Sequence, residues 1–379
     1  MTNTKLSVEK LFDGESIRFE QSITVTNGKI IDVSDSVGCD LVLPGILVPG
    51  YIDIQVNGGG GLLFNQSPNF ETIKKIGEAH QQFGTTGWLP TLITDSVEKM
   101  TMAADAVAEA LRNNLPGILG IHFEGPFLSK QKKGVHFESF IRKIGCEELA
   151  ILKRKDLGKV LITLAPESVS PYQIRELVES GVIVSLGHSN ATFEQTSQAI
   201  DAGATGFTHL FNAMSPFTSR EPGMVGAAIS AKNCFSGIIL DGVHVHPDSA
   251  YLAYRANKKL MLVTDAMPPV GSNKKSFEFF GGKITSNGLI LTDSEGRLAG
   301  SALDMHTAVI NAERMLKIEQ YEAINLASRN PAKFLGLESQ YGKLCQGFCA
   351  SMLLISDNGN VIANWIDGKN VFNSVNKNN

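Results

Sequence analysis

The chain has few cysteines, no long apolar run and no excess of positive charge. Its five cysteines are an odd number scattered over 379 residues, which argues against a disulfide framework and favours a reducing compartment. No window reaches the roughly 18 uninterrupted apolar residues of a membrane span, and the first residues lack the apolar core of a signal peptide. We therefore expect a soluble, cytoplasmic protein that has no membrane partner.

The charge balance also excludes a class of partners. The 34 basic and 38 acidic residues leave a net charge of -4, and this gives no support to nucleic-acid binding. Cys345 and Cys349 are spaced like half of a zinc knuckle, but no second pair or nearby histidine completes one, so we expect free thiols. A hydrophobic content of 43% is ordinary for a globular enzyme.

The two ends of the chain have the alternating pattern of β-strands. Residues 5–45 alternate polar and apolar positions and contain Asn27-Gly28, a strong hairpin signal. Residues 348–372 return to the same alternation, with turns at DNGN and DGKN. Because chain ends in compact domains often lie close together, we expect residues 1–47 and 338–379 to form one small β-sandwich.

The middle of the chain alternates short apolar runs with helical stretches. Eight such units in about 220 residues favour a (β/α)₈ barrel over an open doubly wound sheet, so the fold class is α/β with a barrel over residues 48–337. The expected strands lie within residues 51–56, 87–93, 117–124, 160–166, 182–188, 206–212, 235–242 and 260–267. The expected helices lie within residues 71–83, 96–114, 171–180, 193–203 and 247–258, with two more after residue 300.

Two histidines, His188 and His209, each follow a buried strand and precede a polar loop. Side chains at the carboxyl ends of parallel barrel strands converge on one opening, so both imidazoles can bind the same ion. Glu124 occupies the corresponding position after an earlier strand. Catalytic zinc takes three protein ligands and keeps a position for water, and these three residues supply that number.

A metal site that activates water needs a group to take and return a proton. Asp265 follows the eighth strand and is our candidate, although an aspartate before a proline-rich turn is also a common Asx-turn residue. Asp241 competes for the same role. The neighbouring His244 is a candidate ligand-binding residue, while His246 is equally well explained by a structural role.

Basic loops point to an anionic substrate. Residues 127–139 follow Glu124, are basic and contain His136, so they would overhang the site. Arg220 lies in the loop after His209, and arginine binds phosphate through two hydrogen bonds. The glycine run after Asn57 lacks the Gly-Lys-Ser/Thr ending of a phosphate loop, and Gln55 and Asn57 are poor zinc ligands.

Ten motifs occur in order between about residue 45 and 340. They are PGYIDIQVNGGGG, HFEGPFL, KKGVH, TLAPE, SLGHSNAT, THLFNAM, REPG, DGVHV, LVTDAM and NPAKFLG. In order and spacing they resemble those of the N-acetylglucosamine-6-phosphate deacetylases of the amidohydrolase superfamily, and the β-rich ends also fit.

The resemblance implies a metal-dependent hydrolase that converts N-acetylglucosamine 6-phosphate to glucosamine 6-phosphate and acetate. It also implies a role for each matched residue and a homodimer in which Arg220 reaches the neighbouring site. The implied roles are metal ligands for Glu124, His188 and His209, acid/base for Asp265, substrate carbonyl contact for His136, phosphate binding for Arg220 and His244, and sugar-phosphate contact for Asn212 and Ala213.

One departure from the superfamily pattern concerns the number of metal ions. Many members have His-x-His after the first barrel strand, where this chain has Gln55-Val56-Asn57. The Gln-x-Asn sequence resembles a variant of this motif that occurs within the deacetylases. It lacks the ligands for a second metal, so the resemblance implies one divalent ion per subunit. Zinc is the expected ion, although iron, manganese or cobalt also suits a Glu/His/His set.

Three other functions remain open from the sequence. The substrate could be another N-acyl amino-sugar phosphate, such as N-acetylgalactosamine 6-phosphate, or the enzyme could be a cyclic amidohydrolase similar to dihydroorotase. The third is a non-catalytic binding protein on the same barrel, which we would expect to have lost a ligand or the acid/base. Glu124, His188, His209 and Asp265 are all present.

Overall fold

Eight parallel strands form the body of the computed structural model, which describes residues 4–36, 42–288 and 290–374. The strands run in the order β14-β13-β12-β11-β10-β9-β8-β5, and a parallel bridge between Val56 and Ala266 joins the two edges. The predicted barrel and all eight predicted strands are therefore confirmed. They are β5 (Tyr51–Val56), β8 (Thr85–Ile93), β9 (Gly120–Glu124), β10 (Lys159–Leu164), β11 (Ile183–Leu186), β12 (Gly206–Phe207), β13 (Phe235–Ile238) and β14 (Leu260–Leu262).

Helices surround the barrel, and side-chain caps begin many of them. Ser96, Ser170 and Thr192 accept hydrogen bonds from the first turns of α2, α4 and α5, as their residue types favour. All the predicted helices are present. Helices α3 and α6 were not predicted, and three helices follow residue 300 where two were expected. The helices are α1 (Phe70–Gln81), α2 (Val97–Arg112), α3 (Cys146–Leu152), α4 (Pro171–Glu179), α5 (Phe193–Asp201), α6 (Gly223–Ser230), α7 (Pro247–Ala256), α8 (Met305–Leu316), α9 (Gln320–Ala327) and α10 (Arg329–Phe334).

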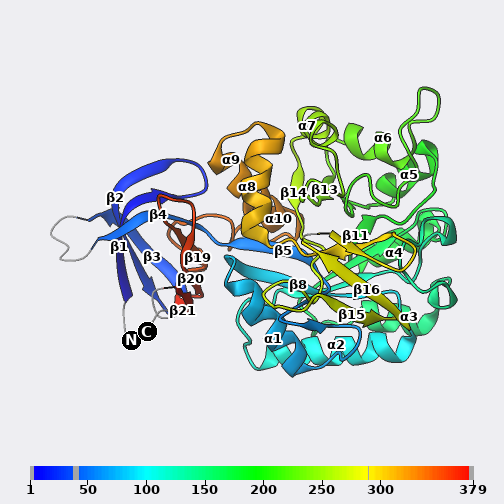
Figure 1. Ribbon diagram of the computed structural model, residues 1–379, viewed down its shortest axis with the longest axis horizontal. Coiled ribbons are helices and arrows are strands. Elements are labelled where there is room, and N and C mark those ends of the chain that lie inside the picture. The colour runs from blue at the N-terminus through cyan, green and yellow to red at the C-terminus, as the bar shows by residue number, and fades with distance from the viewer. Residues whose placement is uncertain (1–3, 37–41, 289, 375–379) are drawn as a thin grey trace.

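Both ends of the chain build one seven-stranded sheet beside the barrel (Figure 1). Its order, β21-β20-β19-β4-β1-β2-β3, joins the termini through the β4–β19 pair and encloses an apolar core of its own. The hairpins at Asn27-Gly28, DNGN and DGKN formed as predicted. The strands are β1 (Thr4–Phe12), β2 (Ile17–Thr26), β3 (Lys29–Asp35), β4 (Leu43–Pro49), β19 (Met352–Ile355), β20 (Val361–Ile366) and β21 (Lys369–Asn373).

The predicted domain boundaries, residues 1–47 with 338–379 and residues 48–337, stay a prediction. Strand β4 of the terminal sheet continues to Pro49, two positions past the first boundary. Phe12 in β1 packs against Tyr321 in α9, with ring centroids 5.0 Å apart, so the terminal sheet contacts the barrel helices directly.

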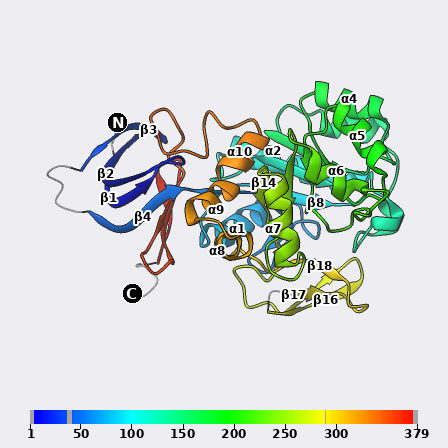
Figure 2. The same cartoon turned by 90° about the horizontal axis from the view of Figure 1, so that it is seen from above.

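A small antiparallel sheet that the sequence analysis did not predict is inserted after β14. Its strands are β15 (Ser276–Phe279), β16 (Gly282–Asn287), β17 (Ile290–Thr292) and β18 (Leu298–Ser301). Figure 2 shows this sheet at one edge of the barrel. Its apolar side packs on Leu63, Ile93 and Met267 from loops and strands near the barrel opening. A second short ladder, β6 (Gly58–Gly59) with β7 (Leu62–Leu63), lies in the glycine run, and two single-turn helices, Lys130–Lys132 and Glu138–Phe140, lie in the basic loop.

Two expectations from the composition can be compared with the described part of the chain. Among the described residues, no helix has the length and apolarity needed to cross a membrane. Cys146, Cys234, Cys345 and Cys349 are free thiols, as expected for the last two. Cys39 lies outside the described residues.

Candidate active site

The functional candidates lie where barrel strands end. Glu124 is the last residue of β9, and His188, His209 and Asp265 follow β11, β12 and β14 by two or three positions. The three that follow strands have positive φ angles: 47° at His188, 32° at His209 and 50° at Asp265. A non-glycine residue in this region is strained, and such strain is concentrated at functional sites. The sharp turn at each strand end directs the side chain into the barrel opening.

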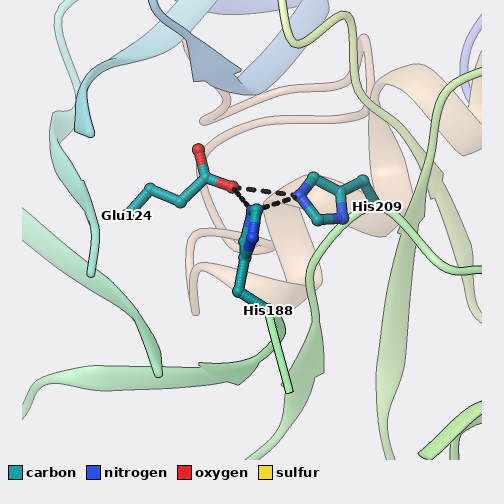
Figure 3. Close-up of side chains that lie close together, drawn as sticks. All are labelled: Glu124, His188 and His209. Carbon is teal, nitrogen blue, oxygen red and sulfur yellow. Dashed lines mark hydrogen bonds and ion pairs between the residues drawn. The ribbon is translucent and has the colours of Figure 1, made fainter. Parts of the chain in front are cut away.

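Glu124, His188 and His209 converge on one point (Figure 3). Glu124 Oε1 lies 3.2 Å from His188 Nε2 and 3.0 Å from His209 Nε2, and the two imidazole nitrogens are 3.0 Å apart. All three residues are buried. Burial alone would raise the pKa of Glu124, but the two adjacent imidazoles hold it well below its usual value.

The chemistry of these atoms fits a divalent cation. His188 Nδ1 lies 2.8 Å from the carbonyl oxygen of Lys132, so it carries the proton and leaves the Nε2 lone pair facing the other ligands. His209 Nδ1 is buried and has no hydrogen-bond partner among the described residues. Two imidazole nitrogens and a carboxylate oxygen within 3.2 Å of one another are a ligand set for zinc or a similar ion.

Asp265 lies next to this triad and is held by two amides. Its Oδ1 accepts a hydrogen bond from Asn57 Nδ2 at 2.6 Å and from Gln55 Nε2 at 3.1 Å. Gln55 Nε2 also donates to Glu124 Oε1 at 3.2 Å. Burial and the nearby negative charge of Glu124 raise the pKa of Asp265, which favours a role in proton transfer.

The amides also occupy the place of the missing His-x-His pair. The N–H groups of Gln55 and Asn57 point at carboxylate oxygens, so they present donors where a second cation would need lone pairs. This arrangement supports the prediction of a single ion.

A cavity of about 310 Å³ opens over the triad. His136 lines it, and its ring centroid lies 4.4 Å from that of His188. His136 Nδ1 lies 2.8 Å from the hydroxyl of Thr94, and burial together with the nearby His188 holds the pKa of His136 well below its usual value. Of the predicted site residues, the cavity is lined by Asn57, Glu124, His136, His188, His209, Asn212, Ala213, His244 and Asp265.

The structure separates the two aspartates that competed for the proton-transfer role. Asp241 Oδ2 lies 2.6 Å from His244 Nδ1, and its Oδ1 accepts the N–H groups of Val243 and His244. Burial opposes ionisation of Asp241, but the hydrogen bond from His244 lowers its pKa. Asp241 thus orients His244 toward the cavity and does not line the cavity itself. His246 is exposed and caps helix α7.

Arg220 lies away from the cavity of its own chain. It is exposed in the loop before α6 and is not among the residues that line the cavity. Among the described residues, no hydrogen bond or ion pair joins it to another candidate.

Several residues that surround the site were not predicted. Asp53 and His122 lie in apolar strands two positions before Gln55 and Glu124, so strand alternation places them on the same inward face, and that signal could have found them. His122 bonds Thr91 and Thr163 beneath the triad, and burial lowers its pKa to about 4. Arg297, from the unpredicted sheet, lines the cavity.

Comparison with known proteins identifies the family of the chain. The model of the amidohydrolase family matches residues 46–371. The chain belongs to the amidohydrolase family. Members of the family are metal-dependent, and the triad of this amidohydrolase is a set that could hold the ion.

Relatives of this amidohydrolase include deacetylases of two amino-sugar phosphates. An N-acetylgalactosamine-6-phosphate deacetylase of Shewanella sp. (strain ANA-3) is 51% identical over 357 residues, which cover 89% of this chain and 90% of that protein. An N-acetylglucosamine-6-phosphate deacetylase of Haemophilus influenzae is 36% identical over 327 residues, which cover 85% and 86%. The crystal structure of N-acetylglucosamine-6-phosphate deacetylase from Pasteurella multocida matches with a TM-score of 0.93 and 34% identity, covering 97% of this chain and 99% of that one.

Proposed function

We propose that this amidohydrolase is a deacetylase that hydrolyses N-acetylglucosamine 6-phosphate to glucosamine 6-phosphate and acetate. The observation that carries the proposal is the convergence of Glu124, His188 and His209 on one point, with Asp265 tied to Glu124 through Gln55. The choice of substrate is supported by two relatives named N-acetylglucosamine-6-phosphate deacetylase, each of which matches most of the chain.

The side chains divide the work of amide hydrolysis. When bound, a divalent ion would act as a Lewis acid and lower the pKa of water toward neutral pH. Asp265 accepts a proton as the water oxygen attacks the acetamide carbonyl carbon. Asp265 then donates that proton to the amine nitrogen as the C–N bond breaks, because an amide nitrogen leaves poorly as an anion. Acetate and the free amine are the products.

The remaining residues bind and orient the substrate. We assign His136 to the carbonyl oxygen, on which negative charge develops during attack, since it lines the cavity beside His188. His244, oriented by Asp241, is assigned to the phosphate, and Asn212 and Ala213 to the sugar.

Arg220 supplies the second phosphate contact from a partner subunit. Two observations support this assignment: Arg220 is exposed, and it does not line the cavity of its own chain. In a dimer, Arg220 could instead reach the cavity of the partner subunit. We therefore propose a homodimer that has one ion per subunit, with zinc as the ion and the cytoplasm as the location.

The test is acetate release by purified protein of measured metal content. We expect one ion per chain, rapid release of acetate from N-acetylglucosamine 6-phosphate, and much slower release from the unphosphorylated sugar. A chelator should abolish turnover, and added zinc should restore it. Equal rates on the two sugars would contradict the phosphate roles of Arg220 and His244, and activity in fully metal-free protein would contradict the mechanism.

N-Acetylgalactosamine 6-phosphate is a second candidate substrate. The 51% identity to the Shewanella enzyme favours it, because that relative shares more of its sequence with this chain than the Haemophilus enzyme does. The same assay with both 6-phosphates, compared by kcat/KM, decides between them. A higher kcat/KM on the galactosamine compound would replace the first proposal and leave the metal chemistry unchanged.

A further inference from the structure

Asp53 is a buried carboxyl group that the proposed reaction does not use. It lies in β5, and its exposed fraction is 0%. Aspartate is rarely buried so completely without a cation, yet the hydrogen-bond partners of Asp53 are two backbone N–H groups and one hydroxyl, from Gln55 and Thr264. Burial raises the pKa of Asp53 to about 7. An arrangement that is unfavourable for stability calls for a functional reason.

The contacts of Asp53 reach both sides of Asp265. The hydroxyl of Thr264 donates to Asp53 Oδ2, and the N–H of Thr264 lies 3.4 Å from Oδ1. The same hydroxyl accepts the N–H of Ala266 at 3.2 Å. Asp265, between these two residues, has its φ angle at 50°, a conformation that only surrounding contacts can maintain.

A second branch of contacts runs through Gln55. The N–H of Gln55 donates to Asp53 Oδ1 at 3.1 Å. Its side-chain amide donates to Asp265 Oδ1 at 3.1 Å and to Glu124 Oε1 at 3.2 Å. One buried carboxyl group therefore contacts the backbone that carries the proton acceptor and the backbone of the amide that orients it.

We propose that Asp53 is a positioning residue, which holds Asp265 in its left-handed conformation through Thr264 and aligns Gln55 against the same carboxylate. The proposal rests on the proposed function, because it assigns Asp53 to the residue that transfers the proton. Among the described residues, Asp53 has no hydrogen bond to the ligand set and does not line the cavity, so it acts through these neighbours.

The test removes each end of the Asp53–Thr264 bond. Asp53→Asn replaces an acceptor oxygen with an N–H₂ group, and Thr264→Val removes the hydroxyl at nearly constant volume. Misplacement of a catalytic group by about 1 Å can cost about 100-fold in rate, so we expect kcat to fall by about 10- to 100-fold in each variant. KM and the metal content per chain should stay within about twofold of wild type, since neither substitution changes the ligand set or the residues assigned to the sugar and the phosphate.

Three comparisons separate positioning from a loss of folded protein. The double variant should be no slower than the slower single variant, because the two substitutions remove the same Asp53–Thr264 hydrogen bond. Thr264→Ser should keep most of the wild-type kcat. Asn364→Ala is the matched control. Asn364 is a fully buried residue of β20 in the terminal sheet, and its side-chain amide donates to the backbone carbonyls of Gln81 in α1 and Thr85 in β8. Its replacement should lower thermal stability without changing kcat per folded chain.

A crystal structure of Asp53→Asn gives a readout that does not depend on activity. We expect Asp265 to leave its left-handed conformation and its contact with Asn57 Nδ2, 2.6 Å in the wild type, to lengthen. If the wild type is active and both Asp53→Asn and Thr264→Val have its kcat, the positioning role is overturned. An inactive, metal-loaded wild type would instead overturn the proposed function, and the crystal structure would then decide the positioning role alone.

Discussion

The proposed role of His136 depends on Thr94. Its hydroxyl lies 2.8 Å from His136 Nδ1 and 3.2 Å from the carbonyl oxygen of Glu124, and it has one proton to donate. His136 is neutral near pH 7, because burial and His188 hold its pKa well below the usual value, so only one of its nitrogens carries a proton. The proposed contact with the substrate carbonyl needs a proton on Nε2, and therefore requires Thr94 to donate to Nδ1.

Thr94→Val removes this donor with little change in volume. A neutral hydrogen bond contributes about 0.5–1.5 kcal/mol, and leaving a buried partner without one costs about 1–3 kcal/mol. The bias toward the Nε2–H tautomer should weaken by a similar amount, which corresponds to a fall in kcat of about 5- to 100-fold. Complete loss of a donor to the developing oxyanion costs about 100- to 1000-fold, and we expect that loss in His136→Ala.

Steady-state kinetics on metal-loaded protein, together with nitrogen NMR of the imidazoles, provides the measurement. Thr94→Ser is the matched control, since it keeps the hydroxyl and should retain most of the activity. The reasoning would be refuted if Thr94→Val kept the wild-type kcat while His136→Ala lost it. In that case another group would keep the proton on Nε2 of His136, or the ring would carry protons on both nitrogens.

Two further predictions concern pH and assembly. The pKa of Asp53 is raised from 3.8 to about 7, so its stabilising effect is complete below pH 3.8 and is lost as the pH rises through about 7. The stability of metal-free wild type relative to Asp53→Asn should therefore fall by about 4 kcal/mol over this range, whereas a pH-independent difference in thermal melts would contradict the shift. Separately, inactive Arg220→Ala and Asp265→Asn subunits, mixed equally and allowed to exchange, should regain about a quarter of wild-type activity, because half of the dimers then contain one complete site. No recovery despite subunit exchange would place Arg220 outside the partner's site.

The barrel could be predicted because short apolar runs recur eight times along the middle of the chain, with helical stretches between many of them. The inserted sheet at 276–301 was missed even though Asn287-Gly288 and Gly281-Gly282 are hairpin signals. Its strands are short, and only one face is buried, against Met267 and against Leu63 and Ile93, which are distant in the sequence. Burial of one face does give alternation, as in β15 and β18, but over four residues that pattern is too short to identify a strand.

The candidate site could be predicted to the extent that its residues stand at strand ends. Glu124, His188, His209 and Asp265 all occupy that position, and strand order alone brings them together. The residues that hold them were not predictable in the same way, because the partner of Asp53 is 211 positions away and the contact depends on barrel closure. Asp241 could be distinguished from Asp265 only when its bond to His244 was seen.

Backbone contacts, more than the ligand side chains themselves, account for the shape of this site. The left-handed residues His188, His209 and Asp265 are each followed or accompanied by a backbone bond to another strand or loop: Ser189 N–H to Ala213, Leu210 N–H to Gly237, and Ser301 N–H to the carbonyl of Asp265. Beneath them, His122, Thr163, Thr208 and Ser185 form a continuous chain of side-chain hydrogen bonds across four strands. A strained conformation persists only where its surroundings determine it more than once, and here main-chain bonds above and side-chain bonds below do so. The bonds of the barrel itself therefore hold Glu124, His188, His209 and Asp265 in their places at the opening.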